Sequence, residues 1–139
     1  MKRLTVRVFL DSCVIVYQIE GAIGVTERVR HRLRPGGRPA PIVVFTDLSR
    51  LECRVKPLAE ELASLLNDYD AFFSTPGFIK ADMDATVFDL ATERRARGGL
   101  KTADALHLAA AVASGCDEIW TNDNRLGRVA SGHLRAVAI

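Results

Sequence analysis

The sequence has 139 residues, of which 48% are hydrophobic and 26% are charged, and its formal net charge is +2. A chain of this size and composition is typical of a globular protein, so we expect one domain over residues 1–139. We find no repeat, low-complexity segment or linker within it. The small net charge favours no particular partner, and the distribution of the charges is therefore more informative than their sum.

Cysteine spacing and hydropathy exclude several classes of protein. The three cysteines are far apart and form no CxxC pair, which excludes a disulfide framework or a zinc site and suits a reducing compartment. The apolar run Val8 to Leu10 is too short for the core of a signal peptide, and no later run is long enough to cross a membrane. We therefore expect a cytoplasmic protein that does not contact a membrane.

The first half of the chain alternates apolar runs with helical patterns. The expected elements in chain order are a strand over Leu4–Leu10, helical segments over Val14–Ile19 and Val25–Leu33, a loop over Arg34–Pro41, a strand over Ile42–Phe45 and a helix over Ser49–Lys56. We expect Pro57 to mark the start of a further helix over Leu58–Asn67.

The second half contains the most informative stretch, Leu100 to Leu126. Only four residues between Thr102 and Ser114 are polar, which predicts a helix buried on most of its surface, with Thr102 as its N-cap. The other elements expected in this half are a short strand over Phe78–Ile79, an amphipathic helix over Asp84–Arg97, a strand over Glu118–Thr121 that ends in the turn Asn122–Asn124, and a last strand over Leu134–Ile139.

Strands separated by helices predict an α/β fold with a mostly parallel sheet, in which ligands bind beyond the carboxyl ends of the strands where the strand order reverses. Four acids fall at positions that this topology would bring there: Asp11, Glu52, Asp104 and Asp123. These acids would repel one another unless a divalent cation neutralised them, and carboxylate oxygens suit magnesium or manganese. The matching chemistry is metal-assisted attack of water on a phosphodiester.

Each acid taken alone also has a structural interpretation. Asp11 could cap the following helix, Asp104 could interact with a helix dipole, and Asp123 could be a turn residue. Ser49 and Glu52 have the spacing of a capping box. The combination of all four acids at corresponding places in the topology is what favours a metal site.

The same residues carry a resemblance to a known family. The segments Asp11-Ser12, Ser49-x-x-Glu52, Lys101-x-x-Asp104-Ala-x-His107 and Thr121-Asn122-Asp123 together resemble a PIN domain, and the size and order resemble the VapC-type toxin ribonucleases. The resemblance implies a Rossmann-like three-layer α/β/α sandwich and a cluster of the four acids that binds Mg²⁺ or Mn²⁺. It also implies an RNA substrate, an antitoxin as protein partner and a homodimer.

A mechanistic hypothesis built on this cluster assigns roles to its residues. Asp11, Asp104 and Asp123 would hold the metal directly or through water, and Glu52 would orient or help to deprotonate the attacking water. Ser12, Thr121 and Asn122 would be supporting residues. In one respect the sequence departs from the family pattern. Many relatives carry another acid shortly after the position of Asp123, whereas Asn124 and Arg125 follow here. Asn can still coordinate a metal or position water, so the sequence leaves open whether the site holds one metal ion or two.

Two basic runs could contact the phosphates of RNA. The first consists of Arg28, Arg30, His31, Arg32, Arg34 and Arg38, and the second of Arg94, Arg95, Arg97 and Lys101. The second is favoured because Lys101 lies beside Asp104. We interpret His107 as a buried, hydrogen-bonded histidine rather than a base or ligand, Trp120 as a core residue, and Cys13 and Cys53 as packing residues.

Other enzyme classes fit the sequence less well. A phosphatase of the haloacid-dehalogenase type needs D-x-D after its first strand, but Cys13 occupies the second position. No neighbouring acids precede Asp47 as in a response-regulator receiver, and no glycine-rich phosphate loop is present. The remaining alternative is a catalytically weak module of the same fold that binds RNA or a protein partner.

Overall fold

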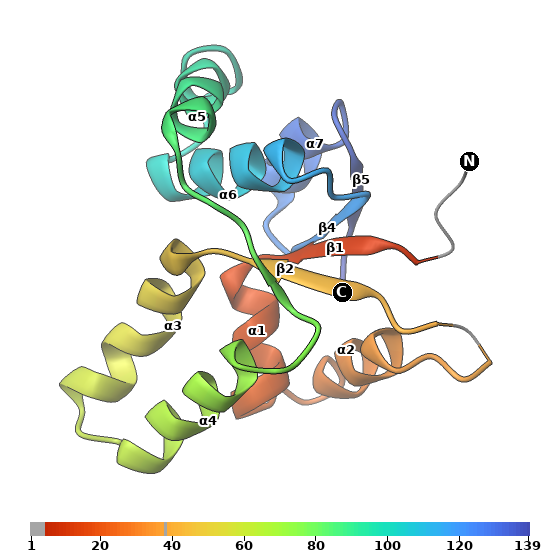
Figure 1. Cartoon of the computed structure of the whole chain (residues 1–139), viewed down its shortest axis with the longest axis vertical. Helices are drawn as coiled ribbons and strands as arrows, with labels where there is room; N and C mark the ends of the chain where they lie inside the picture. The colour runs from red at the N-terminus through yellow and green to blue at the C-terminus, as the bar shows by residue number, and fades with distance from the viewer. Residues whose placement is uncertain (1–4, 38) are drawn as a thin grey trace.

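A parallel β-sheet forms the centre of the computed structural model, which describes residues 5–37 and 39–139 (Figure 1). In this part of the chain the sheet has five strands in the order β3-β2-β1-β4-β5, and every neighbouring pair is parallel. The strands are β1 (Arg7–Leu10), β2 (Ile42–Phe45), β3 (Ile79–Lys80), β4 (Glu118–Trp120) and β5 (Arg135–Val137). The predicted α/β class with a parallel sheet is confirmed.

Helices cover both faces of this sheet and make the fold a three-layer sandwich (Figure 1). One face is covered by α1 (Ser12–Glu20), α2 (Thr26–Leu33), α3 (Asp47–Ala59) and α4 (Ala63–Phe73), and the other by α5 (Ala85–Gly98), α6 (Thr102–Ala113) and α7 (Asn124–Ala130). Because side chains alternate along a strand, each strand contributes to two cores. Phe9 and Ile119 pack on the α6 side, whereas Leu10 and Trp120 pack on the α1 side.

Helix α6 is the buried helix that its apolar sequence predicts. Every residue from 105 to 111 is buried, and the helix lies between the sheet and α5. The predicted N-cap is wrong, however. Lys101 is the N-cap, with an extended backbone whose carbonyl oxygen accepts a hydrogen bond from the Ala105 N–H at 2.9 Å, and Thr102 is the first helical residue.

The structure also corrects the prediction for Pro57. Helix α3 continues through this residue to Ala59, so no new helix starts there, and α4 begins only at Ala63. Proline removes one N–H from a helix, and here it does so in the last turn, where few further bonds depend on it. The capping box of α3 is formed by Thr46 and Ser49, so the proposed pairing of Ser49 with Glu52 is also wrong.

Several other boundaries differ by a few residues. Strand β1 begins at Arg7, while Leu4 at the predicted start lies outside the described residues. Strand β3 is shifted by one residue, and α7 forms directly after Asp123, where the sequence indicated only a turn. None of the helices in the described part of the chain is long and apolar enough to cross a membrane.

Candidate active site

The site lies where the strand order reverses, between β1 and β4. Asp11 follows β1 and is 7% exposed. Its Oδ2 accepts a hydrogen bond from Thr121 Oγ1 at 2.6 Å, and its Oδ1 accepts one from the Ser12 backbone N–H at 2.8 Å. Asp11 therefore does cap α1, as its structural interpretation predicted, and the same hydrogen bonds fix its carboxylate at the carboxyl end of the sheet.

Thr121 links Asp11 to Asp123. Its hydroxyl oxygen accepts a hydrogen bond from the Asp123 N–H at 3.0 Å while donating to Asp11. Asp123 Oδ1 in turn accepts from the Leu126 N–H at 2.9 Å and caps α7. The side chain of Asn122 has a different partner: its oxygen accepts a hydrogen bond from the Ile139 N–H at 2.7 Å. Thr121 thus joins Asp11 to Asp123, whereas the Asn122 side chain contacts Ile139.

Glu52 reaches the same region from α3. Its Oε1 lies 2.6 Å from Ser12 Oγ and 2.5 Å from His107 Nε2. Burial alone would raise the pKa of the Glu52 carboxyl, but the hydrogen bonds from His107 and Ser12 outweigh burial and hold that pKa below its usual range. Glu52 is therefore held in its ionised form by donors from α1 and α6. His107 is the buried, hydrogen-bonded histidine that was predicted, and its partner is a residue of the candidate site.

Asp104 has the opposite environment. Its pKa is raised first by burial and then by repulsion from Asp123 and Asp11, with a smaller contribution from Glu52 and an opposing one from His107. Among the described residues, none donates a hydrogen bond to its carboxylate. The four acids named from the sequence are therefore close enough to influence one another, although they come from four separate segments of the chain.

The carboxylate oxygens of the four acids are the kind of ligand that a hard divalent cation prefers. Within residues 5–37 and 39–139, no three His, Cys, Asp or Glu side chains stand close enough together to enclose a metal ion directly. Magnesium, however, keeps several waters and needs only one or two direct carboxylates. The repulsion that raises the pKa of Asp104 is the interaction that a cation among these oxygens would relieve.

The cysteines near the site are packing residues, as expected. Burial and then repulsion from Asp11 raise the pKa of Cys13 to about 11, and burial and then repulsion from Glu52 raise that of Cys53 to about 12. A thiol that stays protonated at neutral pH is a poor nucleophile or ligand. No cysteine is in a disulfide within the described part of the chain.

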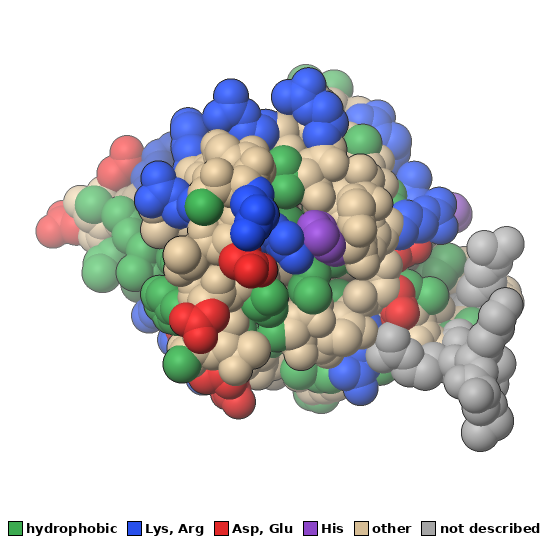
Figure 2. Space-filling model, turned by 90° about the horizontal axis from the view of Figure 1, so that it is seen from above, with side chains coloured by type: hydrophobic (Ala, Val, Ile, Leu, Met, Phe, Trp, Pro, Cys, Tyr) green, Lys and Arg blue, Asp and Glu red, His purple; other side chains and the backbone are tan. Residues whose placement is uncertain are grey.

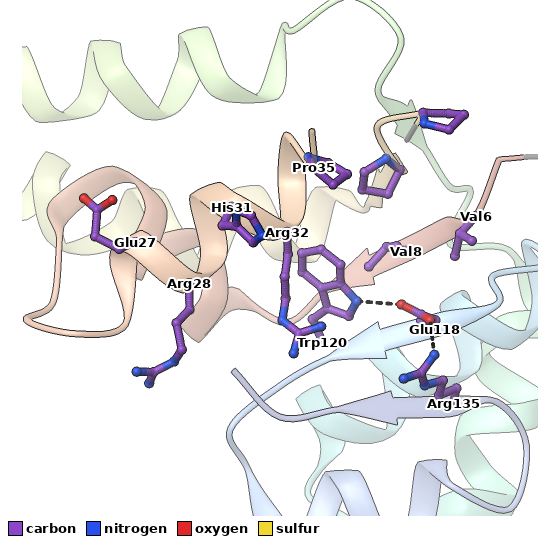
Figure 3. Close-up of a pocket in the computed structure, with 12 residues that line it drawn as sticks. Val6, Val8, Glu27, Arg28, His31, Arg32, Pro35, Glu118, Trp120 and Arg135 are labelled. Atoms are coloured by element: carbon purple, nitrogen blue, oxygen red, sulfur yellow. Dashed lines mark hydrogen bonds and ion pairs between the residues drawn. The ribbon is translucent and has the colours of Figure 1, made fainter. Parts of the chain in front are cut away.

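The two basic runs lie in different places. Arg28, His31 and Arg32 of α2 line a pocket of about 900 Å³, shown in Figure 3, whose floor includes the indole of Trp120. None of the four acids lines this pocket, and Trp120, 3% exposed, is a core residue as predicted. Arg38, which belongs to the same run, lies outside the described residues. Arg28, His31 and Arg32 therefore line a surface other than the acidic site.

The second run belongs to α5 and to the residue that precedes α6. Lys101 precedes α6, three residues before Asp104, and Arg125 extends from the first turn of α7 to within 3.5 Å of the Gly99 carbonyl oxygen. Arg94 of α5 lies 3.4 Å from His133 Nδ1. Figure 2 views the molecule from above, where Figure 1 has α5 and α6, and shows several Lys and Arg side chains along one edge of this view. Sequence reasoning missed Arg125, because α7 itself was not predicted.

A five-stranded parallel sheet between two helical layers, with acids at the reversal of strand order, defines an α/β protein with a crevice site. The model of the PIN domain family matches residues 8–132. The chain belongs to the PIN domain family. No curated protein matches it significantly.

Solved structures of the same fold come from protein complexes. A chain of VapBC2 from Rickettsia felis, bound to a DNA fragment from its promoter, is 14% identical with a TM-score of 0.72, covering 95% of this chain and 98% of that one. A chain of DNA-bound VapBC from Salmonella typhimurium is 15% identical with a TM-score of 0.70, covering 96% and 98%. A chain of FitAcB from Neisseria gonorrhoeae is 16% identical with a TM-score of 0.67, covering 94% and 96%. At these identities the likeness concerns the fold.

Proposed function

We propose that this protein is a metal-dependent endoribonuclease and the toxin of a type II toxin–antitoxin pair. The observation that carries the proposal is the convergence of Asp11, Glu52, Asp104 and Asp123 at the reversal of strand order, where the pKa of Asp104 is raised partly by the other acids. Among the described residues, no Lys or Arg forms an ion pair with these four acids, and His107 is the basic partner of Glu52 alone. Such an acidic cluster is suited to a divalent cation and, through it, to a phosphodiester.

The residues divide into two groups in this proposal. Asp11, Asp104 and Asp123 hold Mg²⁺ or Mn²⁺ directly or through water, and Thr121 keeps Asp11 and Asp123 in their places. The ion, when bound, polarises the phosphate and stabilises the charge that develops on the leaving oxygen. Glu52 orients the attacking water and accepts its proton, for which an ionised carboxylate is required.

The basic residues beside the acids support a nucleic-acid substrate. Lys101 comes three residues before Asp104 and Arg125 two residues after Asp123, while Arg94 and Arg97 belong to α5, which packs on α6. These side chains could bind phosphates on either side of the cleaved bond. We propose RNA as that substrate on the strength of the resemblance to toxin ribonucleases. Binding is then expected to weaken as salt is raised.

A protein partner is supported by exposed apolar side chains. Leu51, Val55 and Leu58 follow one another along one side of α3, next to Glu52, with exposed fractions of 57%, 56% and 67%, and Phe88 of α5 is 51% exposed. Such a surface marks an interface. The neighbours of the same fold come from VapBC and FitAcB complexes, which supports an antitoxin as one partner. A homodimer is the other association that we propose.

Two observations favour a second candidate function, a catalytically weak module that binds RNA or protein. Among the described residues the acids are not close enough to enclose an ion directly, and Asn124 and Arg125 follow Asp123 where many members of the family have a further acid. Such a module would keep the fold and the basic side chains but would not hydrolyse its ligand.

Cleavage of a mixed RNA pool by the purified protein separates the two functions. We would compare Mg²⁺, Mn²⁺ and a chelator, with Asp104→Asn as the inactive control. Cleavage that needs metal and is lost in the variant is the expected result. A folded protein, free of inhibitor, that binds RNA but cuts none under any metal would favour the binding module.

A further inference from the structure

We propose that His107 is a positioning residue that, together with Ser12, holds one oxygen of Glu52 and leaves the other directed to the attacking water. The inference rests on the proposed nuclease function, in which Glu52 acts on that water. It concerns a residue that the sequence indicated to be structural only.

Both donors converge on a single atom. Ser12 Oγ donates to Glu52 Oε1 at 2.6 Å, and His107 Nε2 lies 2.5 Å from the same oxygen. No described residue donates to Oε2. A carboxylate held by two donors on one oxygen cannot rotate freely, so the position of its second oxygen is fixed as well. The donors come from α1 and α6, and the glutamate comes from α3, so three helices define this geometry.

The imidazole is itself immobilised. His107 is 1% exposed, and its ring packs at a tilt of 50° on Phe9 of β1, with 5.5 Å between the ring centroids. A carboxylate can only accept a hydrogen bond, so in this contact the imidazole donates from Nε2. The ring therefore presents one fixed N–H to Glu52.

The environment of the other ring nitrogen of His107, Nδ1, argues that packing alone does not explain a histidine at position 107. Nδ1 is buried and has no hydrogen-bond partner among the described residues. Burying an unpaired polar atom costs stability, and leucine would fill the same place on this apolar helix without that cost. The N–H of Nε2 is what leucine lacks, and its partner is a side chain 31% exposed at the site rather than a backbone group of the core.

The test compares His107→Leu, which removes the donor, with His107→Gln, whose amide can donate in place of Nε2–H. We expect His107→Leu to lower kcat on RNA by about 10- to 100-fold with KM nearly unchanged, and His107→Gln to recover most of that loss. Ser12→Ala, which leaves the core intact, is expected to lower kcat in the same way but less. His31→Leu, an exposed histidine of α2, is the matched control and should cleave like the wild type.

A second readout does not depend on cleavage. In NMR spectra of the metal-free wild type, the Nε2–H of His107 should give a downfield, slowly exchanging signal, and Glu52→Ala should abolish it. A persisting signal would overturn the proposed contact, as would wild-type kcat in folded His107→Leu. If the wild type cleaves no RNA, the proposed function fails, and the NMR result by itself decides whether His107 holds Glu52.

Discussion

Glu52 and Asp104 are two carboxylates of one site with opposite environments. Hydrogen bonds from His107 and Ser12 outweigh the burial of Glu52 and lower its pKa. Burial and repulsion from Asp123 and Asp11 raise the pKa of Asp104, to which no described residue donates a hydrogen bond. The negative charge of Glu52 is thus stabilised by donors from α1 and α6, whereas no described donor stabilises that of Asp104.

The opposite pKa shifts of Glu52 and Asp104 indicate how one acidic cluster can contain both a general base and a metal ligand. Where environments separate the pKa values of neighbouring acids, their roles separate too. The carboxylate that is already stabilised by the protein is available to act on water. The acids that repel one another are the ones that gain most from a cation, and they are therefore the proposed ligands. Each prediction below changes either Glu52 or the region of the proposed metal ligands and leaves the other unchanged.

The largest effect is expected from Asp104→Asn, which removes a proposed metal ligand without changing the size of the side chain. Loss of metal-assisted stabilisation of several kcal/mol corresponds to a fall in kcat/KM of about 1,000-fold or more. RNA cleavage rates and circular dichroism would be measured together, with Asp89→Asn on the exposed face of α5 as control. Near-normal cleavage by folded Asp104→Asn would contradict the assignment.

Glu52→Gln changes the other side. The amide keeps an oxygen that can accept from His107 and Ser12 but cannot take a proton from water, so we expect kcat to fall by about 100-fold. Because Glu52 is not a proposed ligand, Mn²⁺ should bind the variant nearly as well as the wild type, which isothermal titration can measure. A loss of Mn²⁺ binding equal to that of Asp104→Asn would show that both sides hold the metal.

We expect Lys101 and Arg97, which lie close before Asp104 in the sequence, to affect substrate binding more than the basic side chains of α2. We expect Lys101→Gln combined with Arg97→Gln to weaken RNA binding about five-fold and to reduce the salt dependence of Kd, because fewer phosphates are neutralised. Arg28→Gln combined with Arg32→Gln, at the pocket of Figure 3, is the matched control. Equal losses from both pairs would mean that the RNA also covers α2.

The smallest expected effects are changes in the free energy of unfolding, and they have opposite signs for Asp104→Asn and Glu52→Gln. A raised pKa in the folded state disfavours the charged form, so at pH 7 ionised Asp104 destabilises the metal-free protein, and Asp104→Asn should raise its free energy of unfolding. Glu52, whose pKa is lowered, stabilises the fold above its unfolded pKa, so Glu52→Gln should reduce that free energy.

Both changes in stability are expected to be below about 1 kcal/mol, because solvent screens these partly exposed groups. Urea unfolding in chelator at pH 7 and at pH 4 would measure them, and both differences should shrink at pH 4 as the carboxylates take up protons. Destabilisation by Asp104→Asn in the metal-free protein would contradict the repulsion inferred here.

Local patterns in the sequence determined the sheet, the buried helix and three of the acids. Apolar runs indicated β1, β2 and β4, and the near absence of polar residues indicated α6, because these signals lie within a few residues of each other. Asp11 and Asp123 were located because an acid directly after a strand of a parallel sheet must lie at its carboxyl edge. Asp104 was identified as a candidate because it lies in the first turn of α6.

Tertiary structure alone decided what these groups contact. Ser12, Glu52 and His107 are 40 and 55 residues apart, and no local pattern predicts that both donors meet one oxygen of Glu52. Whether a new helix starts at Pro57 depended on the helical turn in which this residue lies, and the segment after Asp123 forms α7 with Asp123 as its N-cap. The sequence thus placed the charges, while packing of α1, α3 and α6 against one sheet determined which of them is stabilised and which needs a cation.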